Sequence, residues 1–138
     1  MSLIDKLLQM DKSKLMEMPT KEVEFERLTK LLGEPFNVKC KAIDGERYAD
    51  IQRSAVDLNK KGGLRDINLF EMQVLTVIDG VIEPSLKDKR LLAYFGCATP
   101  KELVKKLFLA GEIAELSSVI TELSGYDKDE DEEELKKQ

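Results

Sequence analysis

The sequence predicts an α+β fold that is mainly α-helical, with an N-terminal antiparallel β-hairpin packed on a bundle of about five helices. Two short runs that alternate apolar and charged residues lie within residues 23–42. Most of the later chain instead repeats apolar residues at intervals of three and four. A chain of 138 residues buries enough surface for one core without a metal or a disulfide. We therefore predict a single globular domain over residues 19–126.

Residues 1–18 are predicted to form an amphipathic N-terminal segment. Leu3, Ile4, Leu7 and Leu8 share one helical face, and Pro19 ends any helix here. So short an apolar face is marginal alone, which leaves three arrangements open. The segment docks on its own body, docks on a neighbouring copy or another partner, or stays disordered. Its methionines suit an adaptable contact surface.

The predicted hairpin spans residues 23–42. Residues 23–28 alternate apolar and charged side chains, a Gly-Glu-Pro turn follows at residues 33–35, and residues 36–42 alternate again. The expected inner face comprises Val23, Phe25, Phe36, Val38 and Cys40. A two-stranded ribbon is barely stable by itself, so a helix over about residues 44–58 is expected to cover it. Asp44 caps this helix, and Tyr48, Ile51, Ala55 and Leu58 form its apolar stripe.

Two further helices are predicted over residues 66–79 and 86–95. Asp66 caps the first, which is the most apolar stretch of the chain and hence the expected core helix. Gly96 ends the second. The Asn-Lys-Lys-Gly-Gly run at residues 59–63 lacks the spacing of a phosphate-binding loop, and no strand leads into it. It is predicted to be a solvated loop.

The C-terminal part predicts a helical pair over residues 100–109 and 112–124. Thr99, Pro100 and Glu102 form a capping box with proline at the first helical position. Gly111 breaks the apolar pattern, and Glu112 places a carboxylate in the first turn of the next helix. Gly125 ends that helix.

The composition argues against an active site, a metal site and a cofactor. The chain has no histidine, which removes the usual general base and the commonest zinc ligand. Acid groups around Asp44 and Asp127 do not match a calcium loop. Cys40 and Cys97 are expected to be reduced thiols of a cytoplasmic protein, with a disulfide or a reactive thiol as the alternative. No apolar run is long enough to span a membrane.

Charge concentrates at the C-terminus. Residues 127–138 contain seven acids and three lysines, so the rest of the chain is almost neutral and carries no electrostatic footprint for nucleic acid. This acidic tail is predicted to be disordered, because it cannot bury a core. Its role is either solubilising or regulatory and partner-facing.

The chain resembles the XkdN-like tail assembly chaperones of phages and prophages of Gram-positive bacteria. The resemblance rests on Gly80-Val-Ile-Glu-Pro, Leu91-Leu-Ala-Tyr-Phe-Gly96, Thr99-Pro-Lys-Glu-Leu-Val-Lys-Lys-Leu, Ala110-Gly-Glu112 and Leu123-Ser-Gly-Tyr-Asp127. These motifs are helix caps and turns, and their order carries the resemblance.

The resemblance implies a non-catalytic chaperone of the host cytoplasm. Such a protein binds the tape measure protein, keeps it soluble during tail tube assembly, and is absent from the mature virion. A homo-oligomer and a contact with the tail tube protein are further expectations. The alternatives are a structural or adaptor protein that stays in the particle and, third, an enzyme.

The expected partner-binding surface is apolar and helical. An amphipathic client helix binds such a groove through side chains at intervals of three and four. The candidate residues are Leu107, Phe108, Leu109 and Ile113 of the helical pair, with Leu3 and Leu7 of the N-terminal segment. The residues of the pair could equally belong to the core.

Overall fold

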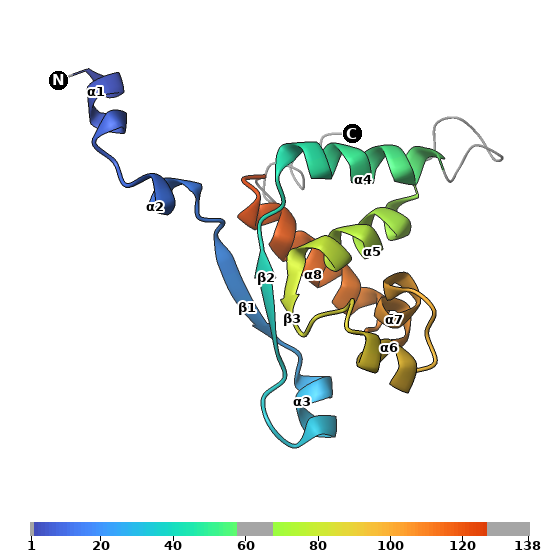
Figure 1. Ribbon diagram of the computed structural model, residues 1–138. Helices are drawn as coiled ribbons and strands as arrows, with labels where there is room; N and C mark the ends of the chain where they lie inside the picture. The colour runs from blue at the N-terminus through green and yellow to red at the C-terminus, as the bar shows by residue number, and fades with distance from the viewer. Residues whose placement is uncertain (1, 58–67, 127–138) are drawn as a thin grey trace, which may run out of the picture.

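The computed structural model describes residues 2–57 and 68–126 (Figure 1). The predicted loop at residues 59–63, the Asp66 cap, Leu58 and the acidic tail at residues 127–138 lie outside the described residues. The predicted α+β class with mainly helical content is confirmed. The elements, in chain order, are α1 Leu3–Leu8, α2 Lys12–Met16, β1 Thr20–Glu24, α3 Glu26–Leu32, β2 Asn37–Lys41, α4 Gly45–Asp57, α5 Leu69–Gly80, β3 Val81–Glu83, α6 Lys89–Tyr94, α7 Pro100–Leu107 and α8 Ala110–Leu123.

The sheet has the order β1-β2-β3 with antiparallel pairing throughout. In the central part Val23 pairs with Val38, and Cys40 pairs with Val81. The predicted hairpin is therefore present, but β3, which follows α5 directly, was not predicted. Three residues are too few to give an alternating pattern that sequence reasoning can detect.

The predicted first strand, residues 23–28, is wrong at its C-terminal end. The strand stops at Glu24, and α3 occupies most of the connection to β2. Phe25 and Leu28 are both buried, which is a helical spacing, and Gly33 ends the helix with a positive φ of 85°. The alternation of apolar and charged residues was too short to distinguish a strand from one turn of amphipathic helix.

The helical layer is centred on α5, which contacts α4, α7 and α8. The helix α8 also packs against β1 and β2 and so joins the sheet to the helices (Figure 1). A Cβ atom at Gly80 would meet the buried side chain of Ile120, which shows how closely α5 and α8 approach. The largest fully buried side chains are Ile51, Leu86, Leu103, Ile113, Leu116 and Ile120.

Helix boundaries follow the capping residues. Asn68 caps α5, because its Oδ1 atom accepts the Glu71 N–H at 3.1 Å. Asp88 caps α6, so that helix is shorter than the predicted residues 86–95. The predicted caps Asp44 and Thr99 accept backbone N–H groups of Arg47 and Glu102, as expected.

Candidate partner-binding site

Residues 2–18, which we call the arm, contain α1 and α2 and are exposed throughout. Ser2 and Asp5 form a capping box at the start of α1, and Asp11 caps α2. Neither helix buries a residue, and the arm leads away from the other elements at the N-terminal end of β1 (Figure 1). Helices of six and five residues are not stable alone in water. Their apolar face is therefore free to pack on another surface.

Half of the exposed large apolar side chains of the described residues lie on the arm, where they form one group along the chain. Their exposed fractions range from 43% to 79%, and the group comprises Leu3, Ile4, Leu7, Leu8, Met10, Leu15, Met16 and Met18. The candidates Leu3 and Leu7 belong to this group. Contiguous exposed apolar surface is typical of protein interaction sites.

The structure divides the four candidates of the helical pair between core and surface. Phe108 and Ile113 are buried, and the ring of Phe108 lies 5.8 Å from that of Phe25 between centroids. Leu107 is half-buried against the core, whereas Leu109 is 58% exposed. In this conformation, only Leu109 and the outer part of Leu107 are accessible to a partner.

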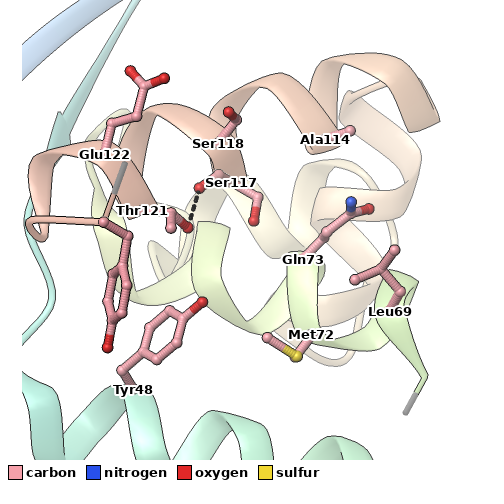
Figure 2. Close-up of a pocket in the computed structure, with 10 residues that line it drawn as sticks. Tyr48, Leu69, Met72, Gln73, Ala114, Ser117, Ser118, Thr121 and Glu122 are labelled. Atoms are coloured by element: carbon pink, nitrogen blue, oxygen red, sulfur yellow. Dashed lines mark hydrogen bonds between the residues drawn. The ribbon is translucent and has the colours of Figure 1, made fainter. Parts of the chain in front are cut away.

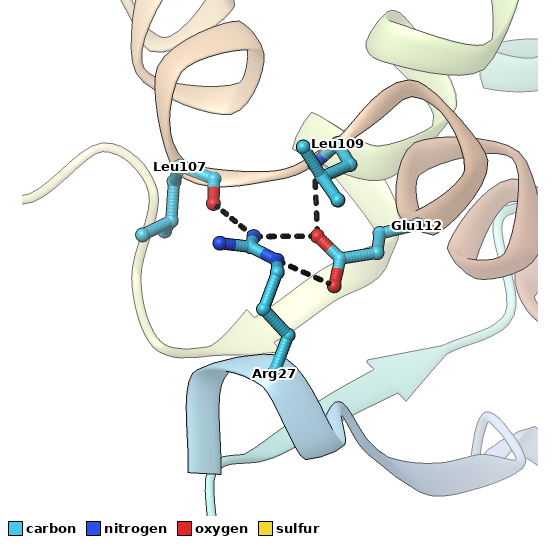
Figure 3. A network of polar contacts seen from close by, with 4 residues as sticks. All are labelled: Arg27, Leu107, Leu109 and Glu112. Carbon is cyan, nitrogen blue, oxygen red and sulfur yellow. Dashed lines mark hydrogen bonds and ion pairs between the residues drawn. The ribbon is translucent and has the colours of Figure 1, made fainter. Parts of the chain in front are cut away.

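The corner between α7 and α8 is held by a polar network (Figure 3). Arg27 of α3 donates to both carboxylate oxygens of Glu112, at 2.6 and 3.2 Å, and to the Leu107 carbonyl oxygen at 3.0 Å. Glu112 also accepts the Leu109 N–H at 2.8 Å, which caps α8. Hydrogen bonding from Arg27 lowers the pKa of the Glu112 carboxyl group. The network fixes Leu109 at the corner and ties α3 to it.

Sequence reasoning missed Arg27 and the leucines that follow it on α3. Leu31 lies one helical turn after Arg27 and is 75% exposed, and Leu32 is exposed beside it. We call Leu107 and Leu109, which the Arg27–Glu112 network holds at the corner, the corner surface. The Leu31-Leu32 pair before Gly33 is a possible signal of an amphipathic helix end, but the alternation on either side of it favours a hairpin connection.

A cavity of about 200 Å³ lies among α4, α5 and α8, with Tyr48 and Tyr126 stacked at one side (Figure 2). Its lining mixes apolar, hydroxyl and amide side chains with the carboxyl group of Glu122. The Thr121 hydroxyl donates to the Ser117 carbonyl oxygen at 2.7 Å. Among the described residues, no group of three metal-ligating side chains is close enough to hold an ion.

A comparison of the sequence with models of protein families identifies the family of this chain. The sequence model of the family described as phage XkdN-like tail assembly chaperone protein matches residues 4–136. The chain belongs to this family. The match includes the arm from Ile4 onward, so the exposed segment lies within the family's own extent.

The fold of this XkdN-like chaperone also has a counterpart among solved structures. The crystal structure of the protein YqbN aligns with a TM-score of 0.60 at 20% sequence identity, over 86% of this chain and 98% of that one. At this identity the likeness concerns the fold alone. A comparison with curated proteins finds no match. No helix in residues 2–57 and 68–126 is both long and apolar enough to cross a membrane.

Proposed function

We propose that this XkdN-like chaperone binds the tape measure protein of a phage tail and keeps it soluble during tail tube assembly, without a catalytic step. The observation that carries the proposal is the arm, whose eight large apolar side chains are exposed while its helices bury no residue. Family membership supports the general role in tail assembly. The choice of client is our inference.

The arm suits a long helical client. An amphipathic helix contributes anchors at intervals of three and four residues, and the arm offers Leu3, Leu7 and Leu8 on one short face. Leucine and methionine side chains adapt to many apolar partners, so one arm can bind different segments of a long chain. Binding would also stabilise α1 and α2, because each gains a packing surface.

The corner surface is the second proposed contact. Leu107 and Leu109 present apolar groups beside the Arg27–Glu112 network, which bonds the Leu107 carbonyl oxygen and the Leu109 N–H. Since the network holds this corner rigid, it can bind without first ordering a loop. In this proposal the arm provides adaptable contact and the corner provides a fixed one.

Co-expression with the tape measure protein tests the proposal. The variant Leu3→Ser/Leu7→Ser removes apolar surface that makes no contribution to the core, so its melting temperature should match that of the wild type. The soluble yield of the tape measure protein should fall. The matched control, Lys6→Ser, changes an exposed residue between them on the same helix and should leave the yield unchanged.

A second variant separates the corner from the arm. Leu109→Ser alters an exposed residue next to buried Phe108 and should weaken client binding while the fold is retained. If both surface variants keep the tape measure protein fully soluble, the client binds elsewhere and the proposed surfaces are wrong.

Location and self-association follow from the same proposal. A chaperone that acts before and during tube assembly belongs in the host cytoplasm and leaves before the virion is complete. A homo-oligomer and a contact with the tail tube protein remain predictions. Light scattering of the purified protein and pull-down with the tube protein test these two separately.

A further inference from the structure

A small charged cavity lies where the arm joins the sheet. It has a volume of about 220 Å³, and its lining includes Met18 at the foot of the arm together with Lys41, Arg47 and Lys87. We call these three cationic residues the basic patch. Two acids, Asp44 and Asp79, also line the cavity. The patch therefore carries an excess of positive charge.

The two acids of the cavity are already engaged. The Arg47 side chain pairs with Asp79, and the Asp44 carboxylate accepts the Arg47 backbone N–H at 2.9 Å. Lys41 and Lys87 form no ion pair with any carboxylate of the described residues. These two ammonium groups are thus available to an acidic partner.

The described part of the chain ends beside this patch. The ring of Tyr126 stacks on that of Tyr48 with 5.2 Å between centroids, and Tyr48 directly follows Arg47. In addition, the Ile43 N–H, from a residue that lines the cavity, donates to Ser124 Oγ at 2.9 Å. Ser124, three residues before the C-terminal segment (residues 127–138), is thus hydrogen-bonded to a residue that lines the cavity.

We infer that the acidic C-terminal segment docks on the basic patch of its own chain. Its seven acids against three lysines supply the opposite charge. Twelve residues span up to about 40 Å when extended. A short tether of this kind gives an effective concentration in the millimolar range, and charges within the ~8 Å Debye length attract even at physiological salt.

Other cations of the described chain are less suited to this role. Lys101 and Lys105 on α7 lie 2.7 and 3.9 Å from the carboxylate of Glu71. Lys12 and Lys14 belong to the arm, which leads away from the body (Figure 1). The patch, by contrast, lines the same cavity as Ile43, whose N–H donates to Ser124.

Docking would restrain the arm at its foot. Met18 lines the cavity, so a segment bound to Lys41 and Lys87 covers one of the exposed methionines of the arm. The acidic segment and a client would then compete for the arm's foot. The contact within the free protein does not depend on what the client is.

Backbone NMR of the free full-length protein tests the inference. One variant replaces the seven tail acids by their amides, which keeps the length of the tail and removes its negative charge. Its amide shifts should differ from the wild type at Met18, at Lys87 and along residues 41–48. In 1 M NaCl, where the Debye length is about 3 Å, these differences should vanish.

Patch variants identify the receiving residues. In Lys41→Gln/Lys87→Gln the tail neutralisation should no longer shift these amides, whereas Lys41→Arg/Lys87→Arg keeps the charge and should preserve the effect. Lys89→Gln is the matched control and should also preserve it, because Lys89 is exposed and outside the cavity. Unchanged shifts at the patch on tail neutralisation, or shifts confined to Lys12 and Lys14 or to Lys101 and Lys105, would overturn the inference.

Discussion

The tight approach of α5 and α8 gives the most direct prediction about stability. A Cβ atom added at Gly80 would lie 2.7 Å from both Cγ1 and Cγ2 of Ile120, with Cδ1 closer still. Ile120 is fully buried, so its side chain cannot swing into solvent. Gly80→Ala must therefore push apart the helices or force Ile120 out of its rotamer.

The magnitude follows from two opposing terms. Overpacking typically lowers the free energy of unfolding by 1–3 kcal/mol, and three close contacts put Gly80→Ala at about 3 kcal/mol. Against this, alanine has a higher helix propensity than glycine, which stabilises the folded state by about 1 kcal/mol. The net loss in the free energy of unfolding should be about 2 kcal/mol, which lowers Tm by roughly 6–10 °C for a domain of this size.

Urea unfolding followed by circular dichroism measures this difference. The matched control is Gly111→Ala in the first turn of α8, where an added Cβ meets nothing within 4 Å. It should be neutral or slightly stabilising. In a double-mutant cycle, Ile120→Ala should remove most of the penalty of Gly80→Ala, because the clashing atoms are gone. If Gly80→Ala unfolds at the same urea concentration as Gly111→Ala, the close packing of α5 on α8 is incorrect.

Three further predictions concern charge, burial and localisation. Glu112→Gln keeps the acceptor for the Leu109 N–H but loses the ion pair with Arg27, so it should cost about 1 kcal/mol at pH 7. The pKa of Glu112 is lower in the folded protein than in the unfolded chain, where it is near 4.3. The ion pair therefore stabilises the fold above that pH, and this stabilisation is lost as the pH falls through the pKa of the folded state. Urea titrations of wild type and Glu112→Gln should converge at low pH. Burial raises the pKa of the Cys40 thiol to about 11, so little of it is thiolate at pH 8. In a Cys97→Ser background, Ellman's reagent at pH 8 should label Cys40 about a hundredfold more slowly in the native protein than in the urea-unfolded chain. Equal labelling rates would contradict the burial of Cys40. Mass spectrometry of purified particles should detect tail tube protein but not this chain, and its presence there would instead favour the structural alternative.

The helices could be predicted from the sequence because their signals are local. Thr99, Pro100 and Glu102 define the start of α7 within four residues, and Asp44 does the same for α4. The apolar repeats identified the five helices α4 to α8 even where boundaries moved by a few residues, but they did not identify α3. The class and the order of these five helices therefore follow from short-range chemistry.

Two features depend on contacts between segments that are distant in sequence. They are the strand β3 and the choice of which apolar residues at the α7–α8 corner are buried. Val81 becomes a strand residue because β2 offers Cys40 beside it, and no short-range pattern encodes that pairing. Phe108 and Leu109 are adjacent and both apolar, yet one packs against Phe25 and the other faces outward. Which neighbour is buried depends on the extended backbone at Phe108 and Leu109 and on the bond from Arg27, which is more than 80 residues away in sequence.

The apolar residues of the arm lie outside the core, so variants of the arm and variants of the corner test different properties. A substitution at Ile113 or Phe108 changes the corner and the core together, so a loss of activity there cannot be assigned to binding. Leu3 and Leu7 contribute no buried surface to the body, and their replacement leaves the folding free energy almost unchanged. If the arm binds the client as proposed, its sequence can change with the client without a cost in folding free energy. The buried residues of the core do not have this freedom, so arm variants are the ones that test binding alone.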